Sequence, residues 1–127
     1  MITQAQKDNI LKWVRDLETT AEPQTKSSLH RLEDSEFGKA GYCCLGRACV
    51  VMGIKEIVPS NASMDKEGLF FFPGYEDPEV GYPQHEWFLE TFGISRKEMN
   101  ELADLNDDSD YSFAQIAAFL RQRYLSE

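Results

Sequence analysis

A chain of 127 residues with 42% hydrophobic residues and a net charge of −9 has the composition of one folded domain and not of a disordered chain. Its first residues lack the basic and apolar stretches of a signal peptide, and nowhere do eighteen apolar residues run together, so neither export nor a membrane contact is expected. The length predicts a single domain over residues 1–127. Three cysteines without an export signal predict a reducing cytoplasm.

The N-terminal segment predicts an amphipathic helix. Thr3 and Gln6 have the spacing of a capping box, in which each side chain bonds the backbone amide of the other residue. We expect a helix that starts at Thr3 and ends at about Leu17 or Glu18. Apolar residues recur along it at helical spacing and predict a buried stripe made of Ile10, Trp13, Val14 and Leu17.

A short strand and a second helix are expected next. Weak alternation of apolar and polar residues over positions 28–32 predicts the strand. An apolar run predicts a helix from about Tyr42 to Met52, which stops near Gly53. Farther along, residues 69–72 are typical of a short strand or extended segment.

The C-terminal part predicts three more helices. Pro83 fits the first turn of a helix that runs to about Phe92, with Trp87 and Phe88 facing inward and Leu89 as a further candidate. Capping boxes predict the starts of the other two helices, at Ser95 with Glu98 and at Ser112 with Gln115. The former is expected to run through about Leu102 or Leu105, and the latter to carry on one face Phe113, Ile116, Ala117, Leu120 and Tyr124. The fold class is therefore mainly α, or α+β with a minor β element: about five short helices and a small hairpin or extended segment.

Adjacent cysteines are the most distinctive local feature. Cys43 and Cys44 cannot bridge to each other without severe strain, so both are expected to be thiols. In the first turn of a helix, the helix dipole lowers the pKa of a thiol, which makes either residue a weak candidate for a catalytic nucleophile. Alternatively, these two residues and Cys49 are small core residues in an apolar helix.

A thiol nucleophile needs a base, and the chain has two histidines. His85 is the weak candidate, in a grouping of Cys44 with His85 and Asn106. The other grouping that can be written is Cys44 with His30 and Asp107. Nothing in the sequence brings either set together, so no catalytic set is assigned.

Metal sites and cofactors are not expected. The cysteine spacings do not match the paired cysteines of structural zinc sites. Asp104, Asn106 and Asp108 alternate as at the start of a calcium loop, but Ser109 stands where the turn needs glycine, and Gln115 where a glutamate should close the site. We interpret these residues instead as side chains that shape a turn and cap helices.

Gly46 lies inside the apolar helix, where glycine costs about 1 kcal/mol relative to alanine. Such a glycine indicates close approach of a neighbour, for which residues 70–72 or the Trp87 helix are the candidates; a ligand in the same gap is the alternative. An aromatic run cannot point all its rings to one face of a strand, so Phe71 or Tyr75 is expected at a binding groove.

Negative charge is concentrated in one segment. Residues 76–110 contain eleven acidic and two basic residues, which accounts for the whole net charge of −9. An acidic face argues against direct contact with nucleic acid and favours a basic protein surface as partner. A solvated surface without a partner is the alternative. The face is expected to include Glu86, Glu90, Glu101, Asp104, Asp108 and Asp110.

Two motifs carry a resemblance to a known group of proteins. Cys43-Cys44-Leu45-Gly46 is followed by the segment Leu102-x-x-Leu105-Asn106-Asp107 and then by a helix with Phe113, Ile116 and Ala117. This pattern resembles a family of small phage and prophage proteins whose function is not established. The resemblance implies a phage or prophage accessory protein that acts in the bacterial host cell.

Together these features predict a non-enzymatic accessory protein that binds a host macromolecule through an acidic face, with a defence protein as the target. Two alternatives stay open: a small-ligand binder such as a nucleotide sponge, in which Arg47 would hold phosphate, and a cysteine-dependent enzyme. Candidate binding residues are Tyr42, Cys44, Gly46, Arg47, Phe71, Tyr75, Asn106 and Asp107.

Overall fold

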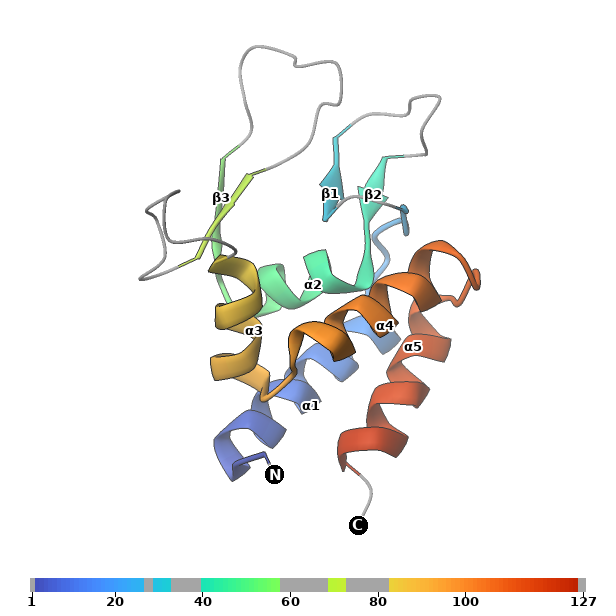
Figure 1. Cartoon of the computed structure of the whole chain (residues 1–127). Helices are drawn as coiled ribbons and strands as arrows, with labels where there is room; N and C mark the ends of the chain where they lie inside the picture. Colours follow the sequence, from blue (N-terminus) through green and yellow to red (C-terminus); the bar gives the residue numbers. More distant parts are fainter. Residues whose placement is uncertain (1, 27–28, 33–39, 58–68, 73–82, 126–127) are drawn as a thin grey trace.

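The computed structural model describes residues 2–26, 29–32, 40–57, 69–72 and 83–125 (Figure 1). Within these ranges the chain is mainly α-helical, with five α-helices and two small antiparallel sheets, which confirms the predicted fold class. No helix in the described ranges is long and apolar enough to cross a membrane.

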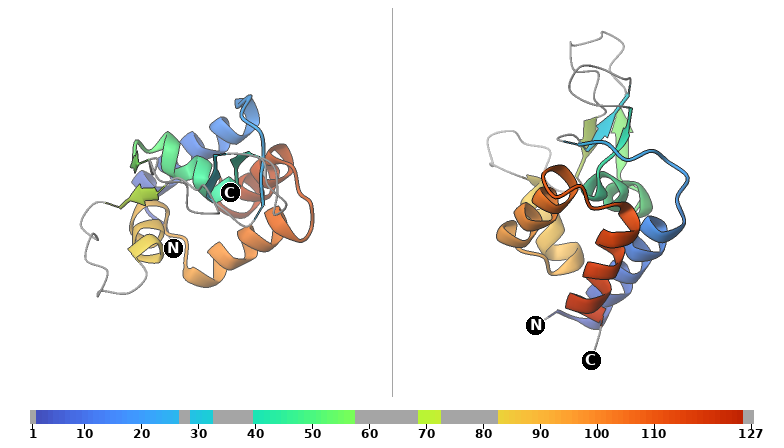
Figure 2. Two further views of the ribbon diagram at one scale, coloured as in Figure 1. Left: turned by 90° about the horizontal axis from the view of Figure 1, so that it is seen from above. Right: turned by 90° about the vertical axis from the view of Figure 1, so that its right-hand side faces the viewer.

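Helix α1 (Gln4–Thr19) contacts three of the other helices. Its start has the predicted capping box: the Thr3 side chain accepts from the Gln6 amide, and the Gln6 side chain accepts from the Thr3 amide. The predicted stripe of Ile10, Trp13, Val14 and Leu17 is buried. Through it α1 packs against α2, α3 and α5, and the start of α1 lies at the same end of the molecule as the last described turn, Arg121–Leu125 (Figure 2).

Helix α2 (Cys44–Val51) starts two residues later than predicted. Tyr42 belongs to strand β2 (Gly41–Tyr42), which pairs antiparallel with β1 (His30–Arg31). The Tyr42 amide and carbonyl also bond the backbones of Pro23 and Thr25, at 2.9 and 2.8 Å. Because these backbone groups are committed to sheet pairing, they are not available to the helix, and Cys43 becomes its N-cap.

A second hairpin follows α2. Strand β3 (Lys55–Ile57) pairs antiparallel with β4 (Leu69–Phe71). The sequence pattern predicted β4 as a strand or extended segment but gave no signal for β3. Phe71 is thus placed on a strand by its backbone, whereas Tyr75 lies outside the described residues.

The C-terminal helices are α3 (Pro83–Phe92), α4 (Arg96–Asp107) and α5 (Phe113–Leu120), which continues as a π-helical turn, Arg121–Leu125. Both predicted capping boxes are present at the starts of α4 and α5. Leu89 does not face inward: it is 51% exposed. The reason is that Phe88 and Phe92, one turn apart, define the buried stripe of α3, and Leu89 lies on its outer side.

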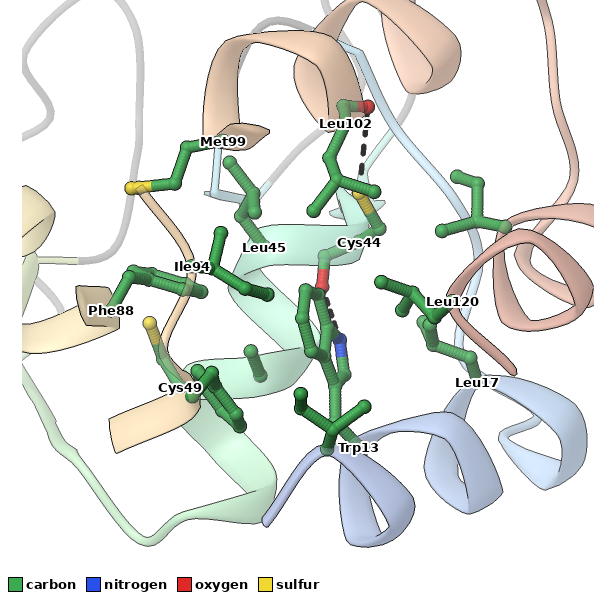
Figure 3. Packing of buried hydrophobic residues seen from close by; sticks show 14 of the residues in the cluster. Trp13, Leu17, Cys44, Leu45, Cys49, Phe88, Ile94, Met99, Leu102 and Leu120 are labelled. Carbon is green, nitrogen blue, oxygen red and sulfur yellow. Dashed lines mark hydrogen bonds between the residues drawn. The ribbon is translucent and has the colours of Figure 1, made fainter. Parts of the chain in front are cut away.

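One hydrophobic core joins the helices (Figure 3). Trp13 is fully buried at its centre, with the Phe92 ring centroid at 5.0 Å and the Phe88 centroid at 6.1 Å. The indole nitrogen Nε1 of Trp13 donates to the carbonyl oxygen of Cys44 at 2.9 Å. This bond places the first residue of α2 directly over α1.

Candidate functional site

The two motifs that carry the resemblance meet in space, on α2 and α4. The backbone amide of Cys44 donates to Oδ1 of Asn106 at 3.2 Å, and the Cys44 thiol donates to the carbonyl oxygen of Leu102 at 3.8 Å (Figure 3). Asn106 is 1% exposed, and its side chain accepts a hydrogen bond from an amide at the start of α2, although the two residues are 62 positions apart in the sequence. The co-occurrence of the two motifs thus has a structural explanation.

Asn106 also holds the segment that leads from α1 to β1. Its Oδ1 accepts from Nε2 of Gln24 at 2.8 Å, while its Nδ2 donates to the carbonyl oxygen of Thr25 and to Oδ1 of Asp107, both at 2.8 Å. An amide side chain offers two donors and two acceptor sites, and all four are occupied. Asn106 and Asp107, predicted as binding residues, are brought together here by structural hydrogen bonds.

Gly46 is in contact with the backbone of Leu29, not with the aromatic residues that the sequence suggested. A Cβ atom at this position would lie 1.9 Å from the Leu29 carbonyl oxygen and 2.7 Å from its carbon. The same carbonyl oxygen accepts the amide of Cys43 at 3.2 Å. The gap beside Gly46 is therefore filled by the protein backbone, and no room is left there for a ligand.

The three thiols are buried, and their pKa values are raised. Cys43 is 7% exposed and Cys44 and Cys49 are 0% exposed. Desolvation raises the pKa of Cys43 to about 11, although the Gly46 amide, which donates to its Sγ at 3.4 Å, acts in the opposite direction. Burial also raises the pKa of Cys44 and of Cys49. The expectation of a lowered pKa was wrong, because loss of water outweighs the helix N-terminus at these positions.

Among the described residues, the hydrogen-bond partner of the Cys44 thiol is the Leu102 carbonyl and not a histidine. His30 stacks on Tyr42, with ring centroids 3.9 Å apart and planes 11° apart, and its Nδ1 bonds the Glu56 carboxylate. His85 lies on α3, where burial and then Arg96 lower its pKa. The two groupings written from the sequence are therefore not assembled.

Arg47 is committed to an ion pair that the sequence did not reveal. Its guanidinium makes two hydrogen bonds to Asp16 on α1, at 2.8 Å from Nε and 2.7 Å from Nη2, and lies 4.7 Å from the centroid of the Tyr42 ring. Hydrogen bonding to Asp16 raises the pKa of Arg47. Because Arg47 is only 7% exposed and its guanidinium is held by two hydrogen bonds to one carboxylate, it is not free to bind phosphate.

Asp104, Asn106 and Asp108 do not form a loop. Asp104 and Asn106 lie within α4, and Asp108 is its C-cap, so Asp104 and Asp108, four residues apart, share one face of the helix while Asn106 points away from them. Asn106 is buried, whereas Asp104 and Asp108 are exposed. No group of three or more metal-ligating His, Cys, Asp or Glu side chains occurs in the part of the chain that the structure describes.

The acidic residues lie along α3, α4 and the turn that follows. Glu86, Glu90, Asp104, Asp108 and Asp110 are exposed. Glu101 and Asp110 have basic partners: Glu101 bonds Arg123 at 2.6 Å, and Asp110 pairs with Lys26. Exposed acidic side chains of the described residues in this segment thus lie on α3, at Glu86 and Glu90, and at the end of α4, at Asp104 and Asp108.

The thiols are expected to react slowly in the native protein. At a pH of about 7.5 we expect iodoacetamide to label Cys43, Cys44 and Cys49 at least about 100-fold more slowly than a small free thiol, because they are buried and protonated. Mass spectrometry of the adducts over time measures the rate, with the protein in concentrated guanidinium chloride as the control in which all three react. Fast labelling of Cys43 or Cys44 in buffer would contradict this expectation.

Comparison with known proteins adds no relative, since no family model, curated protein or solved structure matches the chain.

Proposed function

We propose that the protein is a non-enzymatic phage or prophage accessory protein that binds a basic host protein in the bacterial cytoplasm. The observation that carries the proposal is the set of exposed acidic side chains on α3 and at the end of α4, in the segment that holds the net charge of −9. A host defence protein that grips DNA through a basic surface is the partner class, because an acidic protein surface competes for the same cations.

The geometry of the other candidate residues gives less support to the two alternatives. Thiol catalysis would need a base beside Cys44, where the described residues place the Leu102 carbonyl, and a thiolate, whereas burial raises the pKa of each thiol. Nucleotide binding loses Arg47, which is held by Asp16, and loses the gap beside Gly46, which the Leu29 backbone fills. Binding of a protein partner through the exposed acidic side chains requires neither a reactive thiol nor a phosphate site.

A pair of matched variants tests the acidic surface. Asp104→Asn with Asp108→Asn removes two exposed charges from the end of α4, whereas Asp8→Asn with Glu22→Gln removes the same charge from exposed positions on α1 and just beyond it. The tagged proteins are used to capture partners from a bacterial host lysate, and the captured protein is then titrated in purified form. We expect the α4 variant to bind at least about ten-fold more weakly, and the control within about two-fold of the wild type.

Salt dependence supplies the second criterion. A complex held by exposed charges is expected to form at about 50 mM ionic strength and to be lost at about 500 mM, because screening shortens the reach of charge–charge interactions. Tight binding that is unchanged at high salt, or an equal loss in both variants, would count against an acidic contact surface. Recovery of the tagged protein without any bound host protein at both salt concentrations would count against the proposed function itself.

A further inference from the structure

A hollow of about 280 Å³ opens beside Asn106, where the segment after α1 meets the turn between α4 and α5. Its lining residues all carry a polar group, and they are Gln24, Lys26, Asn106, Asp110, Tyr111 and Ser112. Pockets for small molecules measure about 300–1,000 Å³. This hollow lies at the lower end of that range, so it suits a ligand of amino-acid size better than a nucleotide.

The walls of the hollow are held in place by hydrogen bonds. Nε2 of Gln24 donates to Oδ1 of Asn106 at 2.8 Å and to the carbonyl oxygen of Tyr111 at 2.7 Å. The Tyr111 amide in turn donates to the Leu105 carbonyl at 3.0 Å. Between them Asp110 adopts a left-handed backbone conformation with φ of 55°, which is uncommon for a residue with a side chain. These hydrogen bonds hold Gln24 and Tyr111 in place without a ligand.

Two polar groups in the lining keep capacity for a ligand. Both hydrogens of the Gln24 amide are used, and its Oε1 has no hydrogen-bond donor among the described residues, so this oxygen remains an acceptor. The Ser112 Oγ accepts the Gln115 amide at 3.2 Å, which leaves its hydroxyl hydrogen to donate. The hollow therefore offers an acceptor for an ammonium group and a donor for a carboxylate.

The charges at the mouth of the hollow have opposite signs. Lys26 and Asp110 form an ion pair whose side chains are 48% and 74% exposed. Exposed ion pairs contribute little to stability, so a ligand that replaces both partners separates this one at small cost. A ligand of one charge would meet one partner of opposite sign and one of like sign, whereas a zwitterion places an opposite charge against both Lys26 and Asp110.

From this arrangement we infer that the hollow binds a small zwitterion of the α-amino acid class. The ligand's carboxylate bonds Lys26 and the Ser112 hydroxyl, while its ammonium group bonds Asp110 and the Oε1 of Gln24. This inference goes beyond the proposed function and does not rest on it, because it requires no protein partner and shares only Asp110 with the predicted acidic face.

Titration with defined small molecules tests the inference. Isotope-labelled protein is titrated with glycine, L-alanine and L-serine, and with acetate and methylammonium as probes that carry one charge each. We expect saturable amide shifts confined to residues 24–26 and 106–112 with at least one amino acid, and at least about ten-fold weaker binding of both single-charge probes.

Matched variants locate the site. Lys26→Gln and Asp110→Asn are each expected to weaken amino-acid binding at least about ten-fold, and asparagine is compatible with the left-handed backbone at position 110. Lys12→Gln, an exposed lysine on α1, is the control and is expected to leave binding unchanged. The inference is overturned if no amino acid produces a saturable shift at up to about 20 mM. It is also overturned if acetate or methylammonium binds as tightly as the amino acid does, or if the Lys26 and Asp110 variants bind the amino acid as tightly as the wild type does.

Discussion

Replacing Gly46 with alanine is expected to destabilise the protein by about 3 kcal/mol, although the same change in an exposed helix interior stabilises by about 1 kcal/mol. The added Cβ would lie 1.9 Å from the carbonyl oxygen of Leu29. The backbone cannot yield easily there, because that oxygen also accepts the amide of Cys43 at 3.2 Å. Urea unfolding followed by circular dichroism measures the change in free energy of unfolding.

Gly53→Ala is the control for the Gly46 change. Gly53 has a φ of 75°, but an added Cβ meets no atom within 4 Å. Only the left-handed backbone opposes that substitution, which is expected to cost about 1–2 kcal/mol. A Gly46→Ala protein as stable as the wild type, or more stable, would show that the Leu29 backbone does not approach α2 as described.

Replacing Asn106 with alanine is expected to cost about 3–5 kcal/mol of unfolding free energy. The change leaves the Cys44 amide, the Thr25 carbonyl and the Gln24 amide without the partner they share. Each unpaired buried group carries a desolvation penalty, and the start of α2 and the segment before β1 loosen together. Thermal unfolding is expected to show a melting temperature lowered by roughly 10–15 °C.

Asn100→Ala is the matched control on the same helix. Asn100 is exposed on α4, so its substitution is expected to change stability by less than about 0.5 kcal/mol. Equal effects of the two changes would mean that the buried hydrogen bonds of Asn106 contribute nothing beyond helix propensity. Hydrogen exchange at the Cys44 amide gives an independent readout, since it should quicken in the Asn106 variant alone.

The sequence by itself determined where three helices begin. Each of these starts depends on a reciprocal pair of hydrogen bonds between residues three apart, at Thr3 with Gln6, at Ser95 with Glu98 and at Ser112. Such contacts form inside one helical turn and need no other part of the chain, so the local pattern is sufficient to predict them. The buried stripe of α1 follows in the same way from helical periodicity.

The sequence was less informative wherever another segment competes for the same groups. The start of α2 is displaced because the backbone of Tyr42 is bonded to Pro23 and Thr25 and not to the helix. Strand β3 has no pattern of its own and is defined by its pairing with β4. These outcomes are decided by contacts between residues that only the folded chain brings together.

At the candidate site, the sequence identified residues but not their roles. Gly46 and Asn106 were selected from the motifs, and Tyr42 and Arg47 from the residues next to them. The partner of Arg47, Asp16, lies 31 residues away in the sequence, and Gln24, a partner of Asn106, lies 82 residues away. The helix position of Cys43 indicated a lowered pKa, whereas burial under neighbouring elements raises it to about 11. Interactions within one turn are encoded in the spacing of a few residues, but desolvation and distant hydrogen bonds depend on how the whole chain packs, and here they were decided by the tertiary structure.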